Sequence, residues 1–359
     1  MPESAHFFEG LKVIELASVL AGPAVGMFFA ELGAQVIKIE NKSRGGDVTR
    51  TWRLPQEDKS NPFSAYYCSV NYGKESLMLD LSNPKDKELL EALLREADIV
   101  ISNYRPKVAE KWSLDYSSIK KTNPSVLFGH ISGYPDSDRA AFDVVLQAET
   151  GFLSMSGESG RPPAKMPVAL IDILAAHQLK EALLLAYIHK LKSGEGSAVY
   201  VNLFESALAS LANQATNWLM AGHIPQPMGC QHPNIAPYGD LFYSQEGNAF
   251  VLAVGSDQQF EELCILLGNE QWAKEDRFAK NQDRLANRAA LVELLQTEFA
   301  KHKEAYWAQL FDEKSVPAGF VRNMKEVFSQ KQTERMVLDW KAPNQKAFSV
   351  RSVAFQWEN

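Results

Sequence analysis

Asp172 is the residue whose type and position most clearly permit chemistry in this sequence. It follows the short apolar run 168–171 and stands at the head of a helical pattern that continues to about Leu191. The apolar positions of this pattern wrap almost all round the helix, which predicts a buried helix. Aspartate is a favoured helix N-cap, and a carboxylate kept ionised at a helix N-terminus is also a competent nucleophile. The pattern alone leaves both interpretations of Asp172 open, and they are compatible.

Other kinds of catalytic centre have less support. The seven histidines are scattered and form neither an HxxxH nor an HExxH pair, so a zinc enzyme is not indicated. The sequence has no P-loop and no GxSxG elbow, and the nearest small-residue turn, 154–160, does not supply one. Cys68, Cys230 and Cys264 lie far apart without metal-site spacing, which is typical of reduced thiols in a cytoplasmic protein. We therefore expect no metal and no permanently bound cofactor.

Alternating strands and helices must position Asp172. A βαβ unit of about thirty residues opens the chain, and the strands that follow are almost continuously apolar. This alternation favours an α/β domain with a doubly wound parallel sheet. The expected strands are 11–17, 35–40, 76–81, 98–102, 125–132 and 198–203, and the expected helices are 24–32, 83–97, 144–149, 173–191 and 204–220.

Ligands of such a sheet bind outside the carboxyl ends of the strands. One rim should therefore collect the turn 18–23, the long polar loop 41–61, the segments 103–107 and 133–143, and Asp172. Lys42, Lys74, Arg105 and Lys111 bring positive charge to this rim, which suits a phosphate-bearing ligand, although such side chains are most often only solvated. Asp143 could equally cap the helix 144–149.

The first turn, SVLAGPAVG, holds Gly22 and Gly26 four residues apart. It is not a GxGxxG fingerprint, so a nicotinamide or flavin cofactor is not indicated. The turn could present backbone N–H groups to an anion at a helix N-terminus. Alternatively, the two glycines could serve only to let the helix pack closely on the sheet.

The length of 359 residues exceeds the size at which a single core stops growing, so two domains are expected. The segment 222–238 is rich in Pro, Gly and His, which is typical of a linker. A hairpin at 243–254 and helices at 258–267, 288–300 and 303–311 then predict a smaller α+β domain. We expect a large domain at 1–222, a small domain at 223–315 and a return to the large domain at 316–359.

The net charge of -7 argues against a nucleic-acid or anionic-membrane partner. No apolar run reaches transmembrane length, and residues 1–10 lack the basic and apolar regions of a signal peptide. These features indicate a cytoplasmic protein without a nucleic-acid or membrane partner.

The order and spacing of several motifs resemble the class III coenzyme A transferases. This CaiB/BaiF family includes formyl-CoA and carnitine CoA-transferases and the α-methylacyl-CoA racemases. The resemblance covers nearly the whole chain. The matching segments are LKVIELASVLAGPAVGMFFAELGAQVIKIE (11–40), GGDVTR (45–50), VNYGKESLMLDL (70–81), ADIVISNYRP (97–106), SGYPDSDRAAFDVVLQAETGFLSMSGE (132–158), PVALIDILAA (167–176), VNLFESAL (201–208), HPNIAPYGDLF (232–242) and VPAGFV (316–321).

The resemblance implies a Rossmann-like large domain, a small domain, and a homodimer of two interlocked ring-shaped chains. It implies that Asp172 attacks an acyl-CoA, giving an aspartyl mixed anhydride and then an aspartyl-CoA thioester, before CoA passes to a small carboxylic acid. Coenzyme A is then a substrate. The implied CoA contacts are Leu20, Ala21, Asn41, Val70, Asn71, Tyr72, Lys74, Asn103, Tyr104, Arg105, Lys111, Ala140, Phe142 and Asp143.

The sequence departs from known members at informative positions. Formyl-CoA transferase has an arginine where this chain has Asn41 followed by Lys42, and a glutamine where this chain has Leu20. It also has a glycine-rich loop, for which this chain has no counterpart near 222–232. Racemases have a histidine where this chain has Phe142, which cannot transfer protons. The missing histidine argues against a racemase, which stays the alternative function. The resemblance favours a CoA-transferase, with succinyl-CoA and dicarboxylates as the expected substrates.

Overall fold

The computed structural model describes residues 6–340 and 346–358, and these form two compact units. The first unit contains the described residues up to Ser154, Ala164–Pro225 and the described residues from Gln332 onward. The second contains Met155–Pro163 and Gln226–Lys331. The boundaries expected at residues 222 and 315 stay predictions.

A six-stranded sheet organises the first unit. Every pairing in it is parallel, and the strand order is β3-β2-β1-β4-β5-β6, so the order reverses between β1 and β4. The α/β fold with a Rossmann-like parallel sheet is therefore confirmed. The strands are β1 (Lys12–Leu16), β2 (Gln35–Asn41), β3 (Glu75–Leu79), β4 (Ile99–Ser102), β5 (Leu127–Ser132) and β6 (Ser197–Asn202).

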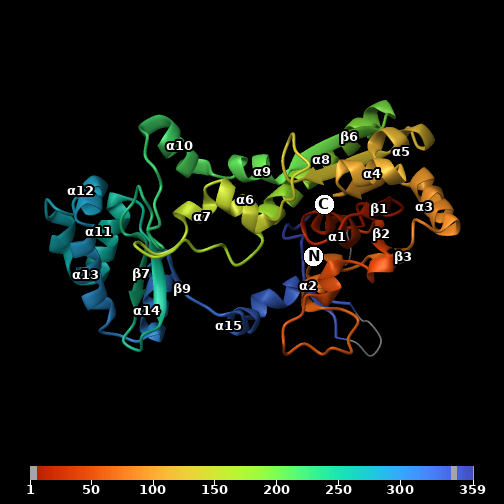
Figure 1. The fold of residues 1–359 in the computed structure, drawn as a ribbon. Helices are drawn as coiled ribbons and strands as arrows, with labels where there is room; N and C mark the ends of the chain where they lie inside the picture. The colour runs from red at the N-terminus through yellow and green to blue at the C-terminus, as the bar shows by residue number, and fades with distance from the viewer. Residues whose placement is uncertain (1–5, 341–345, 359) are drawn as a thin grey trace. The chain divides into compact units, whose positions relative to one another are not determined.

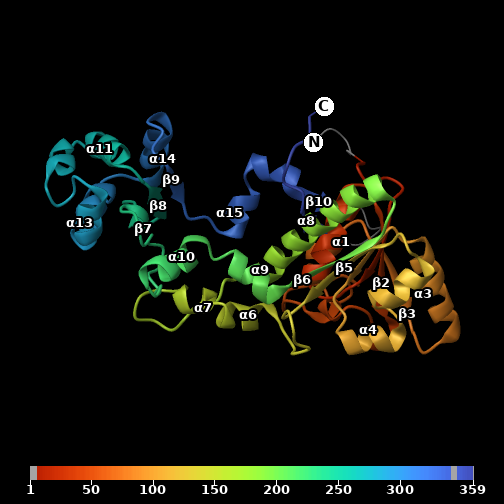
Figure 2. The ribbon, with the colours of Figure 1, turned by 90° about the horizontal axis from the view of Figure 1, so that it is seen from above.

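Helices cover both faces of this sheet (Figures 1 and 2). Alternate strand residues explain the two layers: Ile99 and Ile101 join the core under α1 and α8, whereas Val100 joins the core under α3 and α5. The helices of the unit are α1 (Ala21–Glu31), α2 (Ala65–Asn71), α3 (Pro84–Glu96), α4 (Pro106–Trp112), α5 (Tyr116–Thr122), α6 (Asp143–Glu149), α7 (Phe152–Met155, its last residue in the second unit), α8 (Leu170–Ser193), α9 (Leu203–Ala209) and α10 (Ala212–Ala221).

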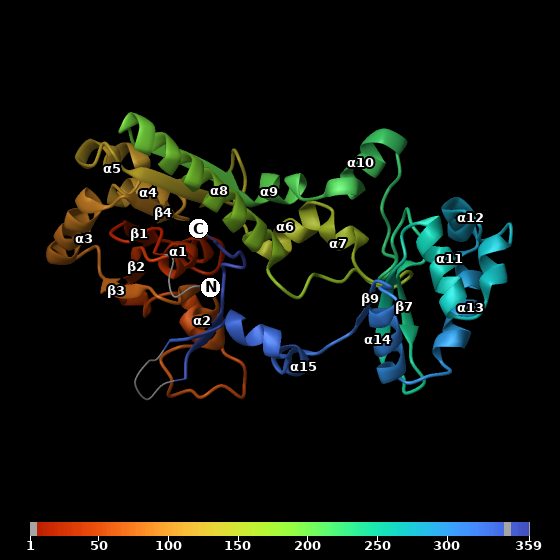
Figure 3. The same ribbon diagram turned by 180° about the vertical axis from the view of Figure 1, so that it is seen from behind.

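The long helix α8 differs from its prediction in two respects. It begins at Leu170, so Asp172 lies inside its first turn and not ahead of it. Its inner face is buried, but Leu185, Ile188 and Leu191 are 68%, 48% and 69% exposed. The prediction of a helix buried all round was therefore wrong, because α8 covers one face of the sheet and its outer side has no neighbour within the described chain (Figure 3).

Three further expectations need correction. The helix expected at 204–220 is divided into α9 and α10, and Ala212 at the break has a positive φ of 47°. The loop expected at 41–61 contains two short 3₁₀ turns, Lys42–Arg44 and Val48–Thr51. The short helices α2, α4 and α5 were not expected, because seven residues give too little periodicity to detect.

The second unit has its own sheet and core. Strands β7 (Tyr238–Tyr243), β8 (Ala249–Ala253) and β9 (Ala318–Phe320) pair antiparallel in that order, so the hairpin is confirmed, with its first strand starting earlier than expected. An aromatic core around Phe242, Phe250 and Phe299 joins the sheet to its helices. The helices in this core are α11 (Asp257–Leu266), α13 (Arg288–Phe299) and α14 (Glu304–Glu313). The unit also contains α12 (Asn281–Ala286) and, after β9, α15 (Met324–Phe328). A separate pair, β10 (Val337–Asp339) with β11 (Phe348–Val350), belongs to the first unit.

Candidate active site

A cavity of about 1370 Å³ opens at the carboxyl ends of β1, β4, β5 and β6. Its position matches the rule for open α/β sheets, in which ligands bind at the point where the strand order reverses. The lining comes from the turn after β1, the segment after β4, the segment between β5 and α6, and Asp172 of α8. All of these elements belong to the first unit.

The turn after β1 is fixed by side chains from two other segments. Asn103, which follows β4, accepts from Ser18 N at 3.1 Å and donates to Ser18 O at 2.9 Å. The Asp47 carboxylate accepts from Val19 N at 3.2 Å, and Val19 has a positive φ of 72°, an uncommon conformation for a β-branched residue. The turn is therefore held in one strained shape at the edge of the cavity.

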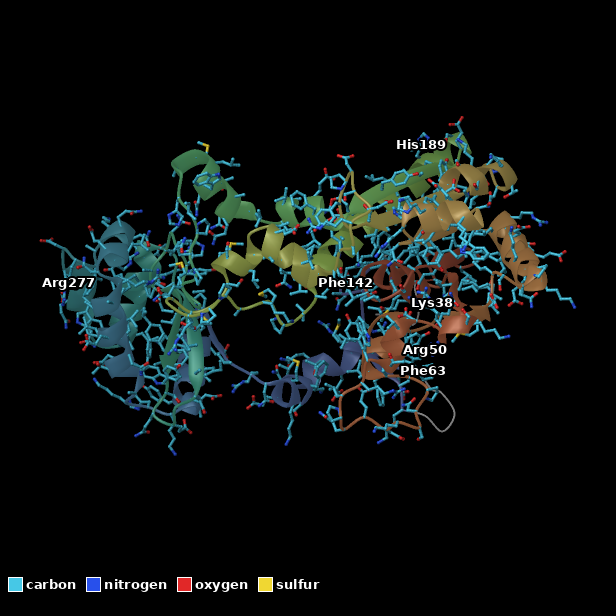
Figure 4. All side chains as sticks on the ribbon, in the orientation of Figure 1. Lys38, Arg50, Phe63, Phe142, His189 and Arg277 are labelled. Carbon is cyan, nitrogen blue, oxygen red and sulfur yellow. The ribbon has the colours of Figure 1, made fainter. Side chains whose placement is uncertain are left out.

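Four buried charges lie directly beneath this turn. The Lys38 ammonium contacts Glu15 at 2.9 Å and Asp47 at 3.0 Å, and it donates to Ala17 O at 2.7 Å. Lys74 contacts the other oxygen of Glu15 at 2.7 Å and donates to Pro23 O at 2.7 Å. Figure 4 labels Lys38 on β2. We call Glu15, Lys38, Asp47 and Lys74 the buried charge cluster.

The two lysines of the cluster are perturbed in opposite directions. Burial lowers the pKa of Lys38, but the charges of Glu15 and Asp47 outweigh it, so the pKa is raised. Lys74 has one adjacent carboxylate, and burial lowers its pKa to about 8. The prediction of Lys74 as a cation for the phosphates of CoA does not fit this position, because its side chain is 1% exposed and its ammonium is already paired.

The glycines of the first turn serve close packing. A Cβ at Gly22 would lie 2.5 Å from Ala17 Cβ, and a Cβ at Gly26 would lie 1.9 Å from Glu15 Oε2. Gly26 thus makes room for the Glu15 carboxylate between α1 and β1. The close-packing interpretation of these glycines is supported, and the charge cluster gives the reason.

Asp172 is buried and lines the cavity. Burial, and then the charge of Asp143, raise the pKa of Asp172 from 3.8 to about 7. The carboxylate accepts no hydrogen bond from residues 6–340 or 346–358. The expectation that helix N–H donors keep Asp172 fully ionised was therefore wrong, and so was its interpretation as an N-cap, because the N-cap of α8 is Ala169.

Asp143 takes the role that the sequence suggested for Asp172. Its Oδ2 accepts from Ile171 N in the first turn of α8 at 2.7 Å, across 28 residues of sequence. It makes no side-chain cap on its own helix α6, whose N-cap is Phe142. Asp143 therefore caps the helix that carries Asp172.

The cavity gathers some of the predicted site residues and not others. Asp172, Leu20, Ala21, Asn103, Tyr104, Arg105, Ala140 and Phe142 line it. Asp143 lies next to Asp172. Asn41, Val70, Asn71, Tyr72, Lys74 and Lys111 are outside the lining; Val70, Asn71 and Lys74 are buried, and Lys111 lies over the Trp112 ring at 5.0 Å.

Several lining residues were not predicted. Tyr116, Phe128, His130 and Tyr200 form an aromatic wall, with neighbouring rings 5.8–6.5 Å apart. Arg44 and Arg139 also line the cavity, and Arg139 is paired with Glu149. The alternation of Phe128 and His130 along β5 was visible in the sequence, but which face they take depends on the neighbouring strands.

The cavity also bears unpaired positive charge. Arg44 and Arg105 are exposed and make no ion pair within the described part of the chain. Phe142 is 57% exposed at the start of α6 (Figure 4) and carries no ionisable group. In the described residues there is no cluster of three potential metal ligands, and no helix is long and apolar enough to cross a membrane.

A parallel sheet, a large cavity at its switch point and a buried carboxylate are typical of the ligand site of an α/β protein. The chain belongs to CoA-transferase family III, whose family model matches residues 8–359. It is therefore a CoA-transferase.

Relatives and solved structures agree with this assignment. The chain is 37% identical to a succinate–glutarate CoA-transferase of Agrobacterium fabrum, covering 93% of this chain and 84% of that protein. It is 31% identical to the human succinyl-CoA:glutarate CoA-transferase, covering 97% and 80%. A CAIB/BAIF family protein from Brucella suis superposes with a TM-score of 0.84 at 36% identity, covering 98% and 92%.

Proposed function

We propose that this enzyme transfers CoA from an acyl-CoA to a carboxylic acid through covalent intermediates on Asp172. The observation that carries the proposal is a carboxylate that lines the cavity and is buried without hydrogen-bond donors among the described residues. Such a carboxylate is poorly solvated, and a poorly solvated carboxylate is a stronger nucleophile once it is ionised. With a pKa of about 7, roughly half of it is ionised near neutral pH.

The steps balance without any further reactant. The ionised Asp172 attacks the thioester carbonyl, which forms a C–O bond, breaks the C–S bond and gives an aspartyl mixed anhydride with a CoA thiolate. The thiolate attacks the aspartyl carbonyl, which gives an aspartyl-CoA thioester and releases the first acid as a carboxylate. The acceptor carboxylate then reverses these two steps and leaves with CoA, and Asp172 is regenerated as a carboxylate.

The substrates we propose are succinyl-CoA as donor and a short dicarboxylate such as glutarate as acceptor. Two relatives above are named for succinate or succinyl-CoA together with glutarate. A third, an acetyl-CoA:oxalate CoA-transferase of Acetobacter aceti at 32% identity, covering 91% of this chain and 83% of that protein, also takes a dicarboxylate. The unpaired Arg44 and Arg105 supply positive charge for the phosphates of CoA or for a free carboxylate.

We also propose that the enzyme is a homodimer. Two apolar surfaces of the first unit lie exposed: Leu185, Ile188 and Leu191 on α8, and Trp218, Leu219 and Met220 on α10, of which Met220 is 86% exposed. Large exposed apolar side chains grouped on one helix are typical of an interface. Analytical ultracentrifugation of the wild type should give the dimer mass, and Leu219→Glu with Met220→Glu should shift it toward the monomer. A wild-type monomer at micromolar concentration would contradict the proposal.

A transfer assay tests the proposed chemistry. The protein is mixed with succinyl-CoA and one acid at a time, and the CoA esters are separated by chromatography. Glutaryl-CoA should form with glutarate, and it should not form with Asp172→Asn. Transfer at the wild-type rate by Asp172→Asn would overturn the mechanism, whereas transfer only to monocarboxylates would overturn the choice of acceptor.

The thiols give a weaker indication of location. Cys68, Cys230 and Cys264 are all unpaired, and a protein with free thiols suits a reducing compartment. We therefore propose that the enzyme works in the cytoplasm.

A further inference from the structure

Helix α6 holds the peptide segment that leads into Asp172 at two points. Asp143 Oδ2 accepts from Ile171 N at 2.7 Å, and Gln147 Oε1 accepts from Met166 N at 2.9 Å. The two acceptors are themselves joined, because Gln147 Nε2 donates to Asp143 Oδ1 at 2.6 Å. We call Asp143 and Gln147 the α6 clamp.

The clamp is partly buried. Gln147 is fully buried and Asp143 is half-buried, and the two lie one helical turn apart, so both side chains lie on the same side of α6. Asp143 Oδ2 and Gln147 Oε1 each accept one backbone N–H from the 166–171 segment, and Gln147 Nε2 orients the Asp143 carboxylate. A network in which both side chains are satisfied favours a single arrangement.

The clamp also places a second carboxylate beside the reacting one. The charge of Asp143 acts on Asp172, and both charges act on Tyr66 of α2, together with Asp47. Within the described part of the chain, no cation contributes to the pKa of Asp172. Of the other elements packed against α8, β5 brings His130 and α9 brings Glu205 to the same cavity, while α1 brings Glu31 near Lys180 at the middle of the helix.

We propose that Asp143 is the positioning residue of the acyl-transfer site: with Gln147 it fixes the first turn of α8, and it places a second carboxylate next to Asp172. This inference rests on the proposed role of Asp172 as the nucleophile. It assigns Asp143 a function apart from any contact with CoA. Asp143 then acts on Asp172 in two ways: it fixes the position of the first turn of α8, and its charge raises the pKa of Asp172.

The two effects predict different pH profiles. Asp143→Asn keeps one oxygen that accepts from Ile171 N and removes the charge, so Asp172 should ionise at lower pH. Its amide nitrogen cannot accept from Gln147 Nε2, so that bond is lost, and the midpoint of the profile reports the charge whereas the absolute rate does not. If the midpoint falls by about one pH unit, the fraction of the maximal acylation rate reached near pH 6 should rise several-fold relative to the wild type. Gln147→Met removes one anchor and no charge, so it should slow acylation at every pH and leave the midpoint in place.

The measurement is the pH dependence of single-turnover acylation by succinyl-CoA, followed as hydroxylamine-trapped adduct on the peptide that holds Asp172. Circular dichroism and thermal unfolding establish that each variant is folded, and Asp143→Glu tests whether a displaced charge still acts. The inference is supported if Asp143→Asn moves the midpoint down while Gln147→Met does not. It is overturned if the midpoint of Asp143→Asn equals that of the wild type or lies above it.

The same experiment distinguishes failure of the inference from failure of the proposed function. If the wild type gives no adduct on Asp172 at any pH, the proposed mechanism is wrong, and the clamp is then a purely structural feature. If the wild type gives the adduct and Asp143→Asn gives it with an unchanged profile, the mechanism stands and the role of Asp143 is refuted.

Discussion

Replacing Asp172 by asparagine should make the protein more stable at alkaline pH while it abolishes transfer. The pKa of Asp172 is raised from 3.8 to about 7, first by burial and then by Asp143. The folded chain therefore binds this proton more tightly than the unfolded chain does. The bound proton makes its full contribution to the free energy of unfolding below pH 3.8, and this contribution is lost as the pH rises from 3.8 through about 7.

The size of the effect follows from the shift. One pKa unit corresponds to about 1.4 kcal/mol, so the rise from 3.8 to about 7 corresponds to at most about 4 kcal/mol of unfolding free energy above neutral pH. Asparagine resembles the protonated acid and does not lose this contribution. We therefore expect Asp172→Asn to match the wild type near pH 4 and to exceed it by about 2–4 kcal/mol near pH 8.

Urea unfolding at both pH values measures this difference. Protein concentration must be held constant, because an assembly makes unfolding concentration-dependent. The exposed Asp312→Asn, on α14, controls for the loss of one negative charge and should show no comparable pH-dependent gain. If Asp172→Asn is less stable than the wild type near pH 8, the ionised carboxylate stabilises the folded state and the reasoning from its burial is refuted.

Three other predictions follow from the same site. Lys38→Met leaves Glu15 and Asp47 buried with one fewer cation, so it should lower the free energy of unfolding by about 3–5 kcal/mol. Lys12→Met, which breaks an exposed pair with Glu96, should change the urea midpoint little. Equal effects of the two variants would contradict the role of the buried charge cluster. Gly26→Ala should lower the melting temperature markedly because its Cβ would meet Glu15 Oε2 at 1.9 Å. Gly255→Ala, whose Cβ would lie 3.7 Å from its nearest neighbour, should leave the melting temperature unchanged. An unchanged melting temperature for Gly26→Ala would show that α1 moves away freely. The first half-reaction with succinyl-CoA should accelerate as the pH rises through about 7, since only ionised Asp172 attacks, and a rate that is flat from pH 5.5 to about 8.5 would argue against this nucleophile.

The sequence predicted the sheet well because its strands are buried on both faces. Near-continuous apolar runs such as Ile99–Ser102 leave few alternatives to a central parallel strand. The carboxyl-end rule then located the turn after β1, Asn103 and Asp172 around one cavity. These parts of the site depend on local pattern and on the topology of the sheet.

The remaining parts depend on contacts between distant segments. The ionisation of Asp172 is set by burial and by Asp143, and the cap of α8 comes from 28 residues upstream, so neither is visible in the residues around position 172. Lys74 seemed a free cation, because its partner Glu15 lies 59 residues earlier in the sequence, on another strand. The outer face of α8 was predicted buried because apolar composition does not distinguish a core from an exposed apolar surface.

The most direct test of the central claim follows one oxygen atom. Each turnover through the proposed intermediates leaves one oxygen of the acceptor carboxylate in the side chain of Asp172. After turnover of succinyl-CoA with glutarate labelled with heavy oxygen in its carboxylates, peptide mass spectrometry should find the label in Asp172. Asp143, the carboxylate whose charge acts on Asp172, should remain unlabelled. Turnover without label in Asp172, or with label in another carboxylate, would contradict the account.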